Sequence, residues 1–206
     1  MATAAGRVEF IQLDVTDEKS IKDAAATVED KLKGGGLDVL INNAGMKDWT
    51  PAGLEGMENL TELFNTNVAA THLVTRAFLP LLRRSDKKVV INLSSTLASI
   101  TKAEDYRLVP SPAYKITKAA LNMLTVQYAQ QYRNDGFTFM AVNPGWLRTD
   151  MGGSDADLPV ETGAGRVIDI AQNACPEQNG KFYNIYLPDW EDIEGFYQYD
   201  GKEICW

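Results

Sequence analysis

The chain has 206 residues, a net charge of −8 and two cysteines that lie 30 positions apart, Cys175 and Cys205. The length suits one domain over residues 1–206, the negative charge argues against nucleic acid or an anionic membrane as the main partner, and two isolated cysteines form neither a disulfide framework nor a metal site. With no apolar run near the ~20 residues of a membrane span and no signal-peptide core at the N-terminus, we expect a cytoplasmic protein.

Strand-like and helix-like segments alternate along the chain. Short runs rich in Val, Ile, Leu and Phe predict strands at 8–15, 37–41, 89–93, 137–142 and 182–187. Apolar residues at helical spacing predict helices after Thr16, over about 57–82, from Pro112 onward and over about 160–174. This alternation predicts an α/β fold with a parallel sheet and right-handed crossovers.

Several details of these elements are specific enough to test. Thr16 and Ser111 are expected to cap two of the helices, and the strand at 37–41 is apolar enough to be buried on both faces. The apolar face of the long helix is predicted to contain Leu60, Phe64, Val68, Thr71, Val74 and Phe78. That of the next helix is predicted to contain Ile116, Ala120, Leu121, Leu124 and Tyr128.

Polar or glycine-containing turns follow three of the predicted strands. These turns are Asn42-Asn43-Ala44-Gly45, Ser94-Ser95 and Asn143-Pro144-Gly145. Because ligands of open parallel sheets bind beyond the carboxyl ends of the strands, the three turns predict a binding site at one edge. Each of these turns alone could equally be an ordinary tight turn or a strand-end hydrogen bond with no role in binding. Asn67, on the predicted buried stripe, could equally be a core amide that hydrogen-bonds the backbone.

Tyr114 and Lys118 lie one helical turn apart at the start of the Pro112 helix. Residues four apart share a helix face, and a helical side chain leans toward the N-terminus, which brings the Lys118 ammonium toward the phenol. A nearby cation favours the phenolate, so the pair predicts a proton donor or acceptor with a lowered pKa. The same spacing also occurs on ordinary surface helices.

Together these residues resemble the short-chain dehydrogenase/reductase family, and within it fungal carbonyl reductases of polyketide pathways such as the norsolorinic acid ketoreductase group. Asn42, Asn43, Ala44 and Gly45 are similar to the family's NNAG turn, and Tyr114 with Lys118 to its YxxxK pair. The resemblance implies four catalytic residues, Asn67, Ser95, Tyr114 and Lys118, with Ser94 as the competitor of Ser95. It implies cofactor contacts from Asp14, Val15, Asn42, Ala44, Gly45, Lys118, Pro144, Gly145 and Thr149, and no metal.

In such a site Tyr114 would protonate a carbonyl oxygen while hydride arrives from the nicotinamide, and Ser95 would stabilise the developing oxyanion. Lys118 would bind the ribose hydroxyls, and Asn67 would hold a water of the proton relay. The implied cofactor is NADP(H) or NAD(H). The implied partners are a small-molecule, polyketide-like substrate and further copies of the chain.

The glycine-rich phosphate loop of the family has no counterpart in this sequence. Only residues 1–7 precede the first predicted strand, and no GxGxxG-like run occurs. We therefore expect a Rossmann-like, doubly wound parallel sheet lacking the first two strand–helix units, roughly 60 residues, and weak or absent nucleotide binding. Three functions remain open: a reductase of this family, a non-redox dehydratase, isomerase or cyclase derived from it, and a non-catalytic dimer partner.

Overall fold

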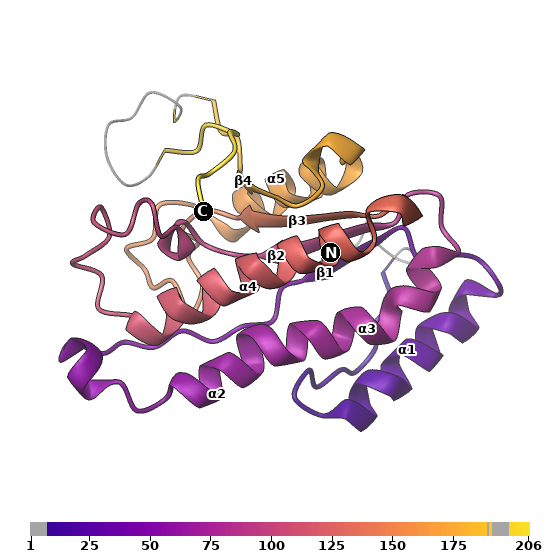
Figure 1. Ribbon diagram of the computed structural model, residues 1–206, viewed down its shortest axis with the longest axis horizontal. Coiled ribbons are helices and arrows are strands. Elements are labelled where there is room, and N and C mark those ends of the chain that lie inside the picture. The colour runs from indigo at the N-terminus through magenta and orange to yellow at the C-terminus, as the bar shows by residue number, and fades with distance from the viewer. Residues whose placement is uncertain (1–7, 189, 191–197) are drawn as a thin grey trace.

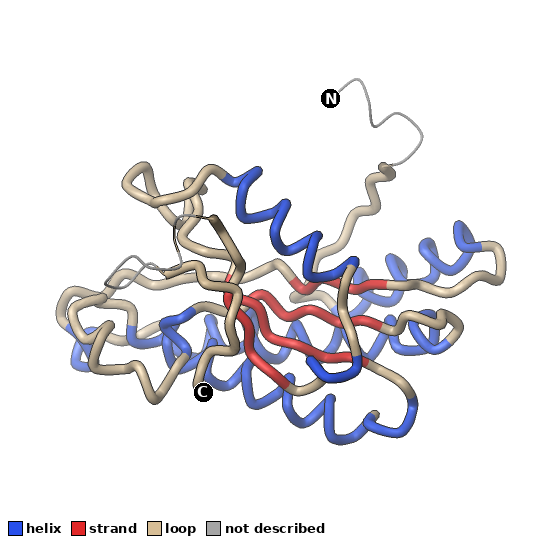
Figure 2. Tube along the Cα trace, turned by 90° about the horizontal axis from the view of Figure 1, so that it is seen from above, coloured by secondary structure: helices blue, strands red, loops and turns tan. Residues whose placement is uncertain are grey.

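A four-stranded parallel sheet forms the centre of the structure, a computed structural model that describes residues 8–188, 190 and 198–206 (Figure 1). The strands β1 (Val39–Asn42), β2 (Val89–Leu93), β3 (Thr138–Asn143) and β4 (Lys181–Asn184) lie side by side in chain order (Figure 2). Pairing of Asn42 with Asn92 and of Leu93 with Val142 brings the carboxyl ends of the strands to one edge. The α/β Rossmann-like fold and the four strands predicted between residues 37 and 187 are confirmed.

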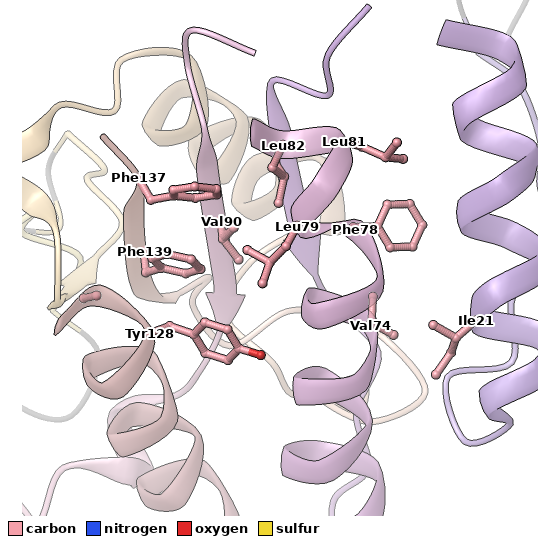
Figure 3. Close-up of a cluster of buried hydrophobic side chains, with 11 residues drawn as sticks. Ile21, Val74, Phe78, Leu79, Leu81, Leu82, Val90, Tyr128, Phe137 and Phe139 are labelled. Carbon is pink, nitrogen blue, oxygen red and sulfur yellow. The ribbon is translucent and has the colours of Figure 1, made fainter. Parts of the chain in front are cut away.

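Helices cover both faces of this sheet (Figure 1). On one face lie α3 (Ala70–Arg83) and α4 (Pro112–Gln131), with α1 (Glu18–Leu32) packed beside α3, whereas α5 (Val160–Gln172) packs on the other face. Strand side chains alternate between the two cores. Val90 and Phe139 point toward α3 and α4 (Figure 3), while Ile91 and Met140 belong to the α5 core.

The three strand-to-strand connections do not share one hand. α3 and α4 join β1 to β2 and β2 to β3 on the same face, but α5 joins β3 to β4 on the opposite face. Because the strand order continues in one direction while the helix changes face, the last connection has the opposite hand to the first two. The prediction that every crossover is right-handed is therefore wrong.

The segment Val8 to Val15 forms no strand, contrary to the prediction. A strand needs a neighbour for its backbone groups, and in the described part of the chain β1 is an edge strand that pairs only with β2. Val8 and Phe10 are consequently 74% and 91% exposed. The expectation that β1 is buried on both faces is wrong for the same reason, since Ile41 on this edge strand is 36% exposed.

The long predicted helix is interrupted by a π-helical turn. It consists of α2 (Leu60–Phe64), the π turn Asn65–Ala69 and α3. The wider turn rotates the residues before it relative to those after it, so Leu63 is buried, Phe64 is 41% exposed and the placement of Phe64 on the buried face is wrong. Asn67, inside the π turn, is fully buried as predicted.

Acidic side chains cap two helices for which hydroxyl caps were predicted. At α1 the N-cap is Asp17, whose carboxylate accepts from the Lys19 N–H, because Thr16 is engaged with Asp14. At α4 Ser111 occupies the N-cap position but makes no side-chain cap bond. Its hydroxyl instead donates to a loop carbonyl, and a carboxylate from that loop binds the helix amides.

The buried face of α4 also differs from the predicted apolar stripe. Ile116 is 42% exposed, whereas Tyr114, Lys118 and Asn122 are buried together with Leu121. This helix therefore turns a row of polar side chains inward, toward the carboxyl edge of the sheet.

Candidate active site

Tyr114, Ser95 and Lys118 meet at the carboxyl edge of β2. The Ser95 hydroxyl, just after β2, accepts from the Leu97 N–H at 3.2 Å, and the Ser95 side chain lies close enough to the Tyr114 phenol to lower its pKa. The Lys118 Nζ donates to the Leu93 carbonyl at 2.7 Å and lies 5.6 Å from the centroid of the Tyr114 ring. The structure thus assembles one phenol, one hydroxyl and one amine, all of them predicted from the sequence.

Burial shifts the pKa values of both ionisable groups. Desolvation raises the pKa of Tyr114 to about 12, an increase opposed by the hydrogen bond from Ser95, and lowers the pKa of Lys118 to about 8. The prediction that Lys118 lowers the phenol pKa is wrong, because loss of water around the phenol outweighs its neighbours. At neutral pH Tyr114 is a neutral phenol and can donate a proton, and Lys118 remains mostly charged.

The turn after β1 leaves room beside Lys118 because it contains a glycine. A Cβ on Gly45 would lie 3.5 Å from the Lys118 Nζ and 3.2 Å from the Asn67 Oδ1. The bare backbone at Gly45 therefore gives a small polar group access to the ammonium.

Asn67 ties this turn to α4, the helix that contains Tyr114 and Lys118. Its Oδ1 accepts from the Met46 N–H at 2.7 Å, and its Nδ2 donates to the Met46 carbonyl and the Thr117 hydroxyl, both at 2.9 Å. Thr117 in turn donates to the Tyr114 carbonyl. Both N–H groups of Asn67 are thus used, so the relay water that was predicted here would have to donate to Oδ1.

Ser94 and Ser95 point to different neighbours. The buried Ser94 hydroxyl donates to the Asn122 Oδ1 at 2.6 Å, on the helix side of the sheet, and of the two serines it is Ser95 that acts on the pKa of the Tyr114 phenol. This geometry favours Ser95 as the hydroxyl that would contact a reacting oxygen.

The side chain of Asn42 is engaged in a ladder that ties the strand ends to the helices. It donates to the Thr75 hydroxyl at 3.0 Å and to the Asn92 Oδ1 at 2.8 Å, and Asn92 donates to Thr125. A cofactor contact from Asn42 would therefore come from its Oδ1 or its backbone. In the same turn Ala44 is exposed.

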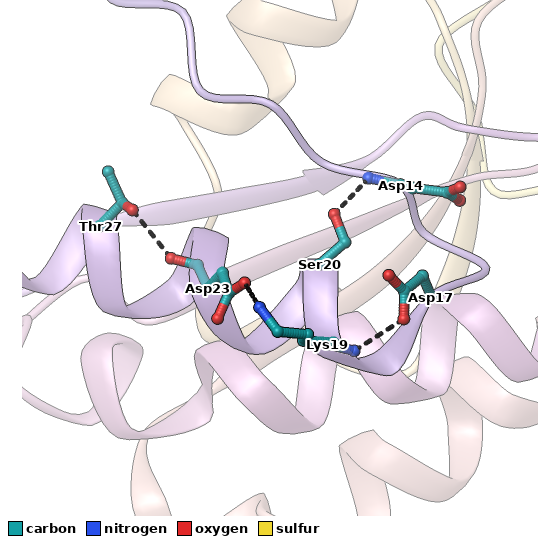
Figure 4. A network of polar contacts seen from close by, with 6 residues as sticks. All are labelled: Asp14, Asp17, Lys19, Ser20, Asp23 and Thr27. Carbon is teal, nitrogen blue, oxygen red and sulfur yellow. Dashed lines mark hydrogen bonds and ion pairs between the residues drawn. The ribbon is translucent and has the colours of Figure 1, made fainter.

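The remaining predicted cofactor residues make their described contacts with other parts of the chain. Asp14 is exposed; its N–H donates to the Ser20 hydroxyl at the start of α1 (Figure 4), and its carboxylate accepts from the Thr16 N–H and hydroxyl. Val15 packs against the core beside α1. After β3, Pro144 and Gly145 pack against α5 and Leu158, and the Thr149 hydroxyl accepts from the Gly152 N–H. Their cofactor roles stay predictions.

Sequence reasoning missed one buried residue of the site, Asp48. Its carboxylate accepts from the Tyr114 N–H at 2.9 Å and from the Thr50 hydroxyl at 2.8 Å. No periodicity or spacing marks it, since its partners on α4 are more than sixty positions away along the chain.

Within the described residues no cluster of His, Cys, Asp and Glu is arranged to hold a metal ion, and no helix has the length and apolarity to cross a membrane. The groups around Lys118 instead suit the ribose of a nicotinamide nucleotide, which offers hydroxyls to an ammonium and to backbone groups. For the diphosphate of such a nucleotide, the described residues contain no glycine-rich turn opening a helix.

Comparison with known sequences points to one protein family. The model of the family described as short chain dehydrogenase matches residues 1–158. The chain is 32% identical to the C-signal protein of Myxococcus xanthus, over 84% of this chain and 94% of that protein. It is 33% identical to the short-chain dehydrogenase/reductase tropE of Talaromyces stipitatus, over 89% of this chain and 75% of that protein.

Solved structures of carbonyl reductases have a similar fold. An NADPH-bound carbonyl reductase from chicken fatty liver superposes with a TM-score of 0.85 at 33% identity, covering all of this chain and 80% of its own. The carbonyl reductase Sniffer of D. melanogaster gives a TM-score of 0.84 at 27% identity, covering all of this chain and 82% of its own. The chain therefore belongs to the short-chain dehydrogenase/reductase family of oxidoreductases.

Proposed function

We propose that this chain reduces a carbonyl group, with Tyr114 as the proton donor. The observation that carries the proposal is the buried neutral phenol of Tyr114, with the Ser95 side chain acting on it and the Lys118 Nζ 5.6 Å from its ring centroid. A carbonyl oxygen between the two hydroxyls would receive two hydrogen bonds that strengthen as negative charge develops on it. Resemblance to fungal polyketide-pathway reductases favours a small polyketide-like ketone as the substrate.

The three side chains have separate tasks in this proposal. Tyr114 transfers its proton to the carbonyl oxygen, and Ser95 holds that oxygen by donating a hydrogen bond. Lys118, still charged at neutral pH, stabilises the phenolate that remains and holds ribose hydroxyls. Asn67 keeps the turn at Gly45 against Lys118 through its bonds to Met46 and Thr117. A reduced nicotinamide, when bound, supplies the hydride.

A non-redox acid–base reaction is the second candidate, and one observation favours it. The proton-transferring groups are assembled, yet the described residues provide no helix N-terminus suited to a diphosphate: α1 opens with Asp17 and Glu18. A dehydration, isomerisation or cyclisation needs only the acid–base set. Dependence of turnover on a nicotinamide separates the two candidates.

Turnover of a panel of small aromatic ketones and quinones tests the proposal. Reduced nicotinamide mononucleotide lacks the second phosphate and the adenosine, so we expect kcat/KM with it to be within about tenfold of that with NADPH, because few contacts to the missing half would be lost. Tyr114→Phe is the control for chemistry at the site. Product formation that needs no nicotinamide would replace reduction by the non-redox candidate, and no product under any condition would exclude both.

A further inference from the structure

Asp48, in the loop after β1, is a buried carboxylate, 4% exposed, that lies against the first turn of α4. Its Oδ1 accepts from the Tyr114 N–H at 2.9 Å, and its Oδ2 lies 3.4 Å from the Ala113 nitrogen and accepts from Thr50 at 2.8 Å. It forms no salt bridge within the part of the chain that the structure describes. Its carboxylate is held by the first amides of α4 and by one hydroxyl, and its charge also acts on the nearby Lys47 and Lys115, where it opposes the lowering of their pKa values by burial.

The backbone around Asp48 is tied to the same place. The Asp48 carbonyl accepts from the buried Ser111 hydroxyl at 2.8 Å, and the Thr50 N–H donates to the Pro110 carbonyl at 2.7 Å. The loop after β1, the segment before α4 and the first turn of α4 are therefore joined through this one residue and its neighbour.

An anion at a helix N-terminus is held by the unpaired amides and by the helix dipole, and it holds the helix in return. The amide that Asp48 binds most closely belongs to Tyr114 itself. A change in that bond moves the phenol relative to Ser95, which is anchored separately at the end of β2.

We propose that Asp48 is a positioning residue that fixes Tyr114 against Ser95 by clamping the first turn of α4. The inference rests on the proposed function in one respect only, namely that Tyr114 is the reacting group. It assigns no contact between Asp48 and substrate or nucleotide.

The test compares Asp48→Ala and Asp48→Asn with Asp17→Ala. Asp17 is a matched control because it also caps a helix with its carboxylate, at the Lys19 N–H of α1 (Figure 4). All chains are labelled with 3-fluorotyrosine, and the fluorine resonance of Tyr114 is assigned by its loss in Tyr114→Phe. Circular dichroism identifies variants that remain folded.

We expect the Tyr114 resonance of Asp48→Ala to move toward that of an exposed fluorotyrosine or to split into two. It should stay near the wild-type position in Asp48→Asn, whose Oδ1 still accepts from the Tyr114 N–H, and be unchanged in Asp17→Ala. If Asp48→Ala does not fold, Asp48→Ser replaces it in the test. Its side chain is shorter than that of aspartate, so we expect its Tyr114 resonance to move from the wild-type position as well. A wild-type Tyr114 resonance in folded Asp48→Ala or, where that variant does not fold, in folded Asp48→Ser overturns the proposal.

Activity gives the second readout. Because misplacement of a reacting group by about 1 Å can cost up to about a hundredfold in rate, kcat of Asp48→Ala should fall between about tenfold and a hundredfold with KM changed less than about threefold. Asp48→Asn should recover most of kcat. Absence of turnover in the wild type would count against the proposed function alone, since the fluorine resonance reports on Tyr114 without substrate or nucleotide.

Discussion

Desolvation shifts the two ionisable groups at the centre of the site in opposite directions. It raises the pKa of the Tyr114 phenol and lowers that of the Lys118 ammonium, because burial disfavours the charged form of each. The site at neutral pH therefore contains a neutral proton donor beside a cation that is close to losing its own proton. This combination suits protonation of a carbonyl oxygen better than abstraction of a proton.

Tyr114→Phe removes only the hydroxyl and should abolish turnover while leaving the fold intact. Its ring packs with Leu63 and Ala113, and phenylalanine keeps these contacts. We expect a loss of kcat of at least about a hundredfold, as is common for a general acid. Turnover assays with thermal unfolding as the control measure this, and unchanged kcat would remove Tyr114 from the proposed mechanism. Lys118→Met should lower kcat nearly as much.

The low pKa of Lys118 predicts how stability depends on pH. In the unfolded chain the amine titrates at its ordinary value of 10.5, and in the folded protein at about 8. Between these values the unfolded state binds more protons, so stability rises as pH increases through this window and the cost of burying the charge is fully present below it. The full difference corresponds to about 3 kcal/mol at most.

Lys118→Met lacks this proton and should not show that rise. We expect the wild type to gain about 1–3 kcal/mol relative to the variant between pH 7 and pH 10. Tyr114 is present in both chains, so the effect of its raised pKa cancels in this difference. Urea denaturation of both chains at several pH values measures the difference. Parallel curves would mean that Lys118 is not desolvated.

At the residue level the sequence predicted which groups meet but not their electrostatics. The spacing of Tyr114 and Lys118 is a local property of a helix, so their proximity could be inferred. The direction of the phenol pKa shift depends on how many distant segments exclude water from Tyr114, which spacing does not show. Asp48 was missed for a similar reason, because its only signal is a contact with a segment far along the chain.

At the level of elements, local sequence patterns predicted the interior strands correctly. They failed where the structure of a segment depends on the segment packed beside it. β2 runs over Val89–Leu93, as predicted, since its apolar residues are buried between two other strands. The run from Val8 to Val15 is also rich in Val, Ile, Leu and Phe, yet no described strand pairs with it. The π turn at Asn65–Ala69 likewise leaves no mark in the apolar spacing and rotates Phe64 outward.

Two glycines on α5 provide a matched test of how this helix packs on the loop after β3. A Cβ on Gly163 would lie 2.4 Å from the Leu147 Cδ2 and 2.6 Å from the Pro144 carbonyl, whereas one on Gly165 would meet nothing within 4 Å. We expect Gly163→Ala to destabilise the protein by about 1–3 kcal/mol and Gly165→Ala to stabilise it by about 0.5–1 kcal/mol. Denaturation of the two variants decides this, and equal effects would contradict the close packing of α5 on Pro144.

The first turn of α1 bears on nucleotide binding. Helix N-termini hold phosphates by their amides, but the described residues contain no glycine-rich turn that opens a helix, and the N-terminus of α1 carries two carboxylates, Asp17 and Glu18. Each charge-assisted hydrogen bond absent from a diphosphate costs about 1.5–3 kcal/mol of affinity. We therefore expect the 206-residue chain to bind NADPH weakly or not at all, and a micromolar dissociation constant from nucleotide fluorescence would contradict this.

At the level of the whole molecule, the described part of the sheet has an open edge at β1. On the side away from β2 the backbone groups of Val39–Asn42 face no other described strand, and edges of this kind pair readily with further chains. Apolar side chains are also exposed on α2 and α4. Phe64 is 41%, Ile116 42% and Met123 59% exposed. These two surfaces account for the expectation that the chain self-associates.

We expect sedimentation at micromolar concentration to find a homo-oligomer, because association would cover apolar surface and, at the edge, unpaired backbone groups. Two variants test the helix surface and a further apolar site, the segment before α1. Met123→Asp places a charge on the α4 face, and Phe10→Asp places one on the exposed segment before α1, where Phe10 is 91% exposed. Dissociation by Met123→Asp alone would assign the contact to the helices, and dissociation by Phe10→Asp alone would assign it to the segment around Phe10. A monomer at every concentration, with one cooperative melt, would show that the β1 edge and the exposed apolar residues are stable in water, and the prediction would be wrong.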